Sequence, residues 1–131
     1  MADESYHFDQ LTREIIVAQL KDDIHAPARA AEIACQTIVA GIRGTQAAHS
    51  NQNVRESVAQ ICRGTMAGLM LIEKNLPDGA IALLQNLADA AQKLSLSPSD
   101  MMTWAMEGIA GLANTAPPEA MNAIQDAINT K

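Results

Sequence analysis

One long stretch, residues 53–76, constrains the fold more than any other feature of the chain. Side chains that recur every three or four positions fall on one narrow arc of a helix: Val54, Val58, Ile61, Thr65, Leu69, Ile72 and Leu76. Glu56, Arg63 and Lys74 fall on the opposite side, so the pattern predicts an amphipathic helix of about six turns. Residues 64–72 carry no charge. We therefore expect this helix to meet neighbours on more than one side.

Five further segments show the same helical period, and no segment shows the alternation of a strand. We expect helices over residues 8–24, 27–48, 78–94, 98–113 and 119–129. Pro27 and Pro98 suit the first turn of a helix, where the missing N–H costs nothing, and Ser97 is expected to cap the helix that follows it. Leu76 is expected to end the long helix, because a residue before a proline disfavours helical geometry.

The connections between these segments are short and polar, which favours antiparallel neighbours. With 131 residues, of which 48% are hydrophobic, the chain suffices for a single core. Tyr6, Phe8 and Trp104 are the only aromatic residues, so the core must be built from Ala, Leu, Ile and Met. The sequence thus predicts an all-α, single-domain bundle of about six helices arranged as antiparallel helical hairpins, with residues 1–7 frayed.

Charge and hydropathy exclude several classes of partner. The net charge is −6 and the basic residues are scattered, whereas a nucleic-acid site needs clustered Lys and Arg. No apolar run approaches the ~18 residues of a membrane span. The acidic start of the chain lacks the basic and apolar regions of a secretory signal. We therefore expect a cytoplasmic protein that binds no nucleic acid and has no transmembrane segment.

Residues able to carry chemistry are few and poorly spaced. In residues 4–7 and 22–25 a carboxylate precedes a histidine by three positions, as in di-iron helical bundles, but the further glutamates of such sites are missing. His49 continues an apolar stripe and is expected to be a helix-end residue. Cys35 and Cys62 occupy helix positions typical of small buried hydrophobes. The sequence predicts no catalytic residue, cofactor or metal, and it does not favour an enzyme.

Glycines and methionines remain to be explained. Each glycine inside a helix costs roughly 1 kcal/mol relative to alanine, and close passage of a neighbouring helix is the compensation that we expect. Close helix packing is therefore predicted at Gly41, Gly44, Gly64, Gly68, Gly108 and Gly111. An interface is predicted at Met66, Met70 and Leu71, because Met70 and Leu71 point away from the main arc of the long helix.

These features favour a non-enzymatic helical interaction or structural module that self-associates, as a homodimer, or binds another protein. The evidence is the uncharged segment, the missing catalytic set, and a first helix with two apolar arcs, one through Leu11 and Ile15 and one through Ile16 and Leu20. Two alternatives stay open. The first is an amphipathic binder of lipid or storage-granule surfaces, similar in general character to phasin-like proteins. The second is a small-ligand-binding helical bundle.

Overall fold

The computed structural model describes residues 8–44, 51–94, 96–114 and 116–129. Within these residues all regular secondary structure is helical, and no strand occurs. The elements are α1 (Phe8–Leu20), α2 (Ala26–Gly44), α3 (Asn51–Leu71), α4 (Leu76–Lys93), α5 (Pro98–Gly111), the short 3-10 turn η3 (Leu112–Asn114) and α6 (Pro118–Asn129). This confirms the predicted all-α bundle of about six helices. The predictions of a frayed segment 1–7, of a helix end at residue 48 and of the role of His49 fall outside the described residues.

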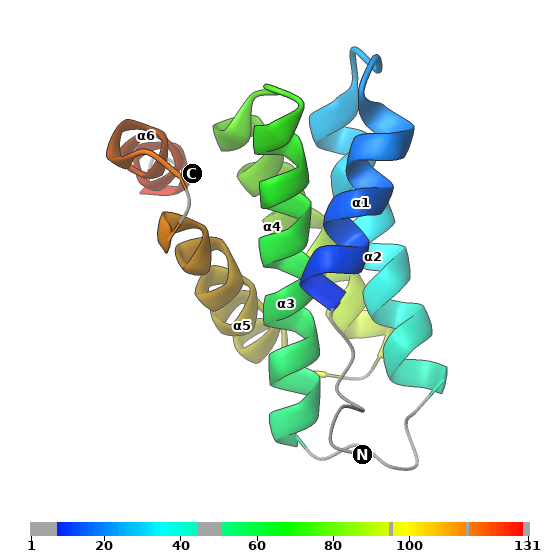
Figure 1. Cartoon of the computed structure of the whole chain (residues 1–131). Coiled ribbons are helices and arrows are strands. Elements are labelled where there is room, and N and C mark those ends of the chain that lie inside the picture. Colours follow the sequence, from blue (N-terminus) through cyan, green and yellow to red (C-terminus); the bar gives the residue numbers. More distant parts are fainter. Residues whose placement is uncertain (1–7, 45–50, 95, 115, 130–131) are drawn as a thin grey trace.

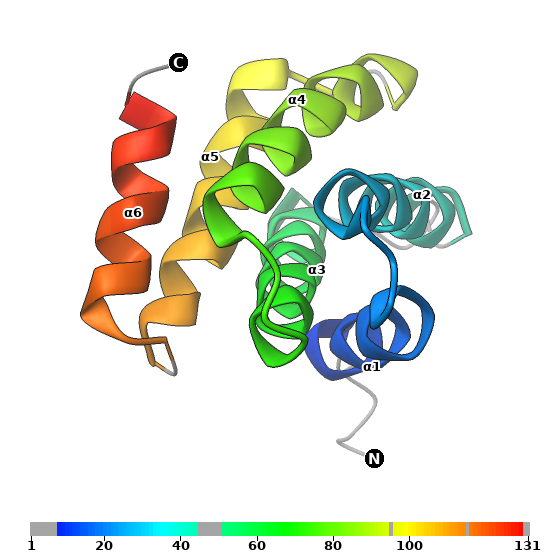
Figure 2. The same cartoon turned by 90° about the horizontal axis from the view of Figure 1, so that it is seen from above.

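The helices interleave along the chain. Successive helices from α1 to α5 alternate in direction (Figure 1), but the most extensive contacts join α1 with α3, α2 with α4 and α3 with α5. Viewed from above, α3 lies between α1, α2, α4 and α5 (Figure 2). The predicted antiparallel neighbours are present, yet each helix makes its most extensive contact with the next but one.

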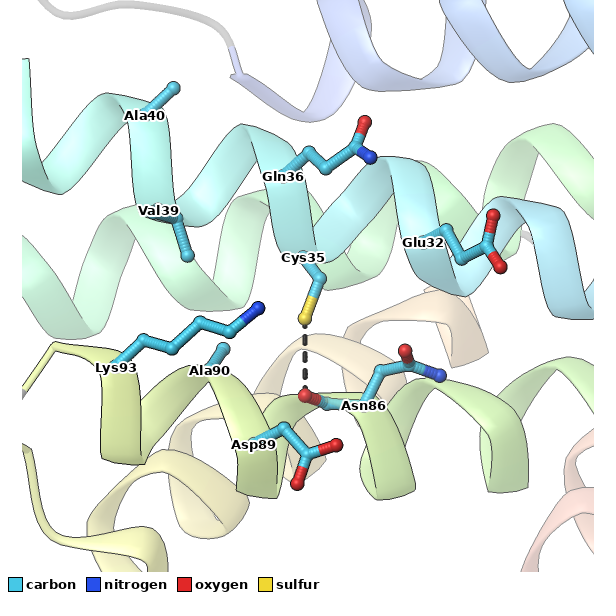
Figure 3. Close-up of a pocket in the computed structure, with 9 residues that line it drawn as sticks. All are labelled: Glu32, Cys35, Gln36, Val39, Ala40, Asn86, Asp89, Ala90 and Lys93. Atoms are coloured by element: carbon cyan, nitrogen blue, oxygen red, sulfur yellow. Dashed lines mark hydrogen bonds between the residues drawn. The ribbon is translucent and has the colours of Figure 1, made fainter.

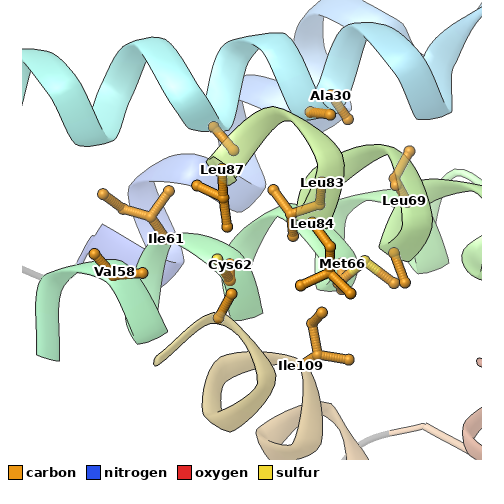
Figure 4. Close-up of a cluster of buried hydrophobic side chains, with 14 of the residues drawn as sticks. Ala30, Val58, Ile61, Cys62, Met66, Leu69, Leu83, Leu84, Leu87 and Ile109 are labelled. Atoms are coloured by element: carbon orange, nitrogen blue, oxygen red, sulfur yellow. The ribbon is translucent and has the colours of Figure 1, made fainter. Parts of the chain in front are cut away.

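The core is aliphatic and centred on α3 and α4 (Figure 4). Ile61, Met66 and Leu69 of α3 and Leu83 and Leu87 of α4 are at most 1% exposed. Each such side chain contributes about 1.5–3 kcal/mol through the area that it removes from water. The predicted core, built chiefly from Ala, Leu, Ile and Met, is therefore confirmed.

The long central helix ends five residues earlier than predicted. After Leu71 the chain turns, and Glu73 adopts a left-handed backbone conformation with φ of 59°. The Glu73 N–H donates to the Met70 carbonyl at 3.1 Å, and the Lys74 N–H donates to the Leu69 carbonyl at 2.9 Å. These two bonds form a Schellman motif, which satisfies the last carbonyl groups of the helix.

Polar caps begin the next two helices. The Asn75 side chain accepts a hydrogen bond from the Asp78 N–H at 2.9 Å, so α4 begins at Leu76. Pro77 lies in its first turn, and the prediction that this proline ends the preceding helix is wrong for that reason. Ser97 accepts from the backbone N–H three residues on, which confirms the predicted cap of α5.

Two glycines of the predicted set lie where helices pass closely. A Cβ atom on Gly68 of α3 would lie 2.7 Å from the Ile16 Cβ and 3.1 Å from the Arg13 carbonyl oxygen of α1. A Cβ atom on Gly108 of α5 would collide with the Ala59 carbonyl of α3. Gly68 and Ala59 are nine residues apart, which places the two crossings on opposite sides of α3.

The other predicted glycines have different surroundings. A Cβ atom on Gly111 would meet only the side chain of Arg63, at 3.1 Å from its Cδ, so no backbone passes closely there. Gly64 is buried in α3. Gly41 and Gly44 belong to α2, and what surrounds them lies outside the described part of the structure.

Candidate functional site

A groove of about 500 Å³ lies between α2 and α4 and is here named the α2–α4 groove (Figure 3). The two helices pack against each other, and each buries small alanines in the core, among them Ala34 of α2 and Ala91 of α4. Longer side chains stand along the outer edge of this contact. The groove is lined by Glu32, Cys35, Gln36, Val39 and Ala40 of α2 and by Asn86, Asp89, Ala90 and Lys93 of α4. Positions three, four and seven apart share a helix face, which explains this set.

Cys35 lies in the middle of the groove and is half-buried. Its Sγ donates to the backbone carbonyl of Asn86 at 3.1 Å. Burial raises the pKa of the thiol above its ordinary value, while the charge of Lys93 lowers this pKa and the charge of Asp89 raises it, both to a smaller extent. Cys35 is therefore a neutral thiol at neutral pH, and a neutral thiol is a poor nucleophile.

Cys62 differs from Cys35 in its surroundings. Its side chain is 0% exposed within the core, and burial raises the pKa of this thiol strongly. The prediction of a packed, hydrophobic cysteine therefore describes Cys62 fully. It describes Cys35 only in part, because one side of Cys35 opens into the groove.

A second hollow, of about 340 Å³, surrounds Arg55 on α3 and Glu107 on α5. The guanidinium donates to both carboxylate oxygens of Glu107, at 2.9 Å from Nε and 2.7 Å from Nη2. This exposed pair links α3 to α5 beside the Gly108 crossing, and Nε and Nη2 of Arg55 are engaged in it. An exposed ion pair of this kind contributes little to stability.

The predicted interface residues separate in the fold. Met66 is fully buried among the side chains of the core, so it is not available to a second subunit, and its assignment to an interface is corrected. Met70 is half-buried against the core. Leu71 is 59% exposed at the end of α3. The uncharged segment thus meets neighbours on several sides, but helices of the same chain supply most of them.

The two apolar arcs predicted for the first helix differ in burial. Ile16 and Leu20 are at most 1% exposed, whereas Leu11 on the other arc is 50% exposed. Ile24 was expected in this helix, but it lies in the turn after Leu20 and is 85% exposed. The sequence pattern did not distinguish the two arcs, because both carry large aliphatic side chains.

The turn that holds Ile24 is ordered by its polar residues. The Asp23 carboxylate accepts a hydrogen bond from the His25 backbone N–H at 2.7 Å and pairs with Arg29 at 3.3 Å. Within the described residues, no three His, Cys, Asp or Glu side chains lie close enough to share a metal ion. No described helix is both long enough and apolar enough to cross a membrane.

Comparison of the chain with protein families, curated proteins and solved structures finds no match in any of the three.

Proposed function

We propose that this chain is a non-enzymatic helical module that self-associates as a symmetric dimer. The observation that carries the proposal is an apolar end surface, defined here by Ile24, Leu71, Ile72 and Leu76. The α1–α2 turn and the α3–α4 connection lie at the same end of the bundle (Figure 1). Ile24 and Leu71 are the two most exposed of the large hydrophobic residues described, at 85% and 59%, and Ile72 and Leu76, which follow Leu71 in the chain, are half-buried.

Burial of this end surface against a second copy is favourable by about 25 cal/mol for each Å² of apolar area removed from water. The residues flanking it carry both signs of charge, including Lys21 and Lys74 as cations and Asp22 and Glu73 as anions. In a two-fold symmetric dimer each patch meets its own copy, so that cations of one subunit can face anions of the other. A polar rim around an apolar centre is the usual composition of such interfaces.

The test replaces both exposed side chains with charges. The double variant Ile24→Glu, Leu71→Glu is expected to shift the dimer to a folded monomer, measured by light scattering with circular dichroism as the check on folding. Leu11→Glu and Met106→Glu are matched controls, because these residues are similarly exposed, at 50% and 40%, but lie on other parts of the surface. A parent protein that is monomeric at micromolar concentration, or a double variant that stays dimeric, contradicts the proposal.

The same variants separate this proposal from the lipid- or granule-surface alternative. Flotation of the parent protein with vesicles would favour the alternative. In that case the Ile24→Glu, Leu71→Glu variant would no longer float with the vesicles. A module that only self-associates stays unbound. We place the module in the cytoplasm, a reducing compartment in which its two free thiols stay unpaired.

A further inference from the structure

Independently of self-association, we propose that the α2–α4 groove binds a small zwitterion of the amino-acid class, a molecule with one ammonium group and one carboxylate. The groove lies along the sides of α2 and α4 rather than at the apolar end surface. Its volume of about 500 Å³ is within the range of roughly 300–1,000 Å³ that is usual for small-ligand sites.

The charged groups of the groove are arranged along it. Glu32 extends from α2 and Asp89 from α4, on either side of the contact between Cys35 and Asn86 (Figure 3). Lys93 follows one helical turn after Asp89, and Figure 3 shows its ammonium group directed toward Cys35. The groove therefore offers two anions and one cation over a short length.

These charges are not neutralised by one another. In the described part of the chain no ion pair within 4.0 Å engages Glu32, Asp89 or Lys93, although Lys93 follows Asp89 at the spacing that commonly pairs on a helix. The charges of Lys93 and Asp89 nevertheless both act on the Cys35 thiol, and in opposite senses. Both charges thus lie near the same point in the groove.

The chemistry of the lining selects the class of ligand. An ammonium group is recognised by the carboxylates of Glu32 and Asp89, and a carboxylate by Lys93, through charge-assisted hydrogen bonds. A diamine could pair with both carboxylates, but it would leave Lys93 without an anionic partner and add cations beside it; a dicarboxylate would add an anion beside Glu32 and Asp89. Like charges held together in this way cost affinity. Val39 and Ala40 offer an apolar surface for the methylene groups of the ligand.

Cys35 supplies a reporter inside the groove. Its alkylation by iodoacetamide is followed by mass spectrometry of the full-length protein, with alanine, glutamine or γ-aminobutyrate present at millimolar concentration. We expect at least one of these zwitterions to slow the alkylation of Cys35 several-fold, while putrescine and succinate have no effect. Protection by putrescine or succinate equal to that by the zwitterions overturns the proposal, as does the absence of any protection.

Variants locate the binding in the groove. Asp89→Asn and Lys93→Gln are each expected to remove the protection of Cys35. Asp126→Asn on α6 and Lys74→Gln in the α3–α4 connection make the same chemical changes away from the groove, and both variants are expected to keep the protection. The side chains of all four residues have substantial contact with solvent, so each variant is expected to keep the folded structure. Circular dichroism checks this. Full protection in both groove variants contradicts the assignment of the charged contacts.

Discussion

At the scale of single residues, Glu73 carries a backbone strain that a glycine would relieve. Its φ of 59° lies in the left-handed region, which disfavours a residue with a Cβ by about 1–2 kcal/mol. Part of the gain is offset because glycine loses more chain entropy on folding. Glu73→Gly is therefore expected to raise the free energy of unfolding by about 0.5–1 kcal/mol in urea denaturation. Glu73→Ala removes the same charge but keeps the Cβ, and an equal gain in that variant would attribute the effect to charge.

Cys35 and Cys62 show what a sequence reveals of single residues and what it does not. Both occupy positions next to apolar stripes, and the pattern indicates that each faces the protein. Whether a thiol is enclosed or lines a groove depends on the helix packed against it. Cys35 contacts Asn86, 51 residues further along the chain. No periodicity within α2 predicts that contact, so the candidate groove was not found from the sequence.

At the scale of helices, two glycines of α5 allow a matched test of close packing. Alanine gains roughly 1 kcal/mol of helix propensity over glycine at either site. At Gly108 the new methyl group collides with the Ala59 backbone, which cannot move without shifting α3, so Gly108→Ala is expected to lower the free energy of unfolding by about 1–3 kcal/mol. At Gly111 the methyl group meets the flexible side chain of Arg63, and Gly111→Ala is expected to be neutral or stabilising.

Chemical denaturation of both variants provides the measurement. Equal stability of Gly108→Ala and the parent protein would mean that α5 can move away from α3 at small cost. A large loss in Gly111→Ala would mean that the position of Arg63 is fixed.

Helix existence followed from periodicity, whereas helix ends and partners did not. Ser97 was recognised as a cap because Pro98 and Asp100 follow it in the usual order. The end of α3 was missed because the residue at its left-handed position is Glu73, and sequence signals for such ends rely on glycine. The pairing of each helix with the next but one was missed because short connections suggest consecutive pairs.

At the scale of the whole molecule, the buried Cys62 makes the stability of the fold vary with pH in the alkaline range. Burial raises the pKa of this thiol in the folded protein above its ordinary value of 9.0. Above pH 9 the unfolded chain therefore loses a proton that the folded protein keeps, and stability falls as pH rises. The free energy of unfolding of the parent protein is expected to fall with pH more steeply than that of Cys62→Ala, by about 1 kcal/mol per pH unit.

The measurement is urea denaturation of both proteins at several pH values between neutral and strongly alkaline. The comparison uses slopes because the loss of the sulfur atom lowers stability at every pH. Parallel curves for the parent protein and Cys62→Ala would show that the thiol ionises without opening the core.

The interleaved packing also has a consequence for synthesis on the ribosome. A chain released as far as α2 can form only the small contact between α1 and α2, since the main partners of these helices, α3 and α4, are still to be made. The apolar faces of the first two helices thus stay open to water, chaperones and proteases until the middle of the chain has emerged. Helix α6 is made after the other described helices and packs mainly on α4, which has by then been released.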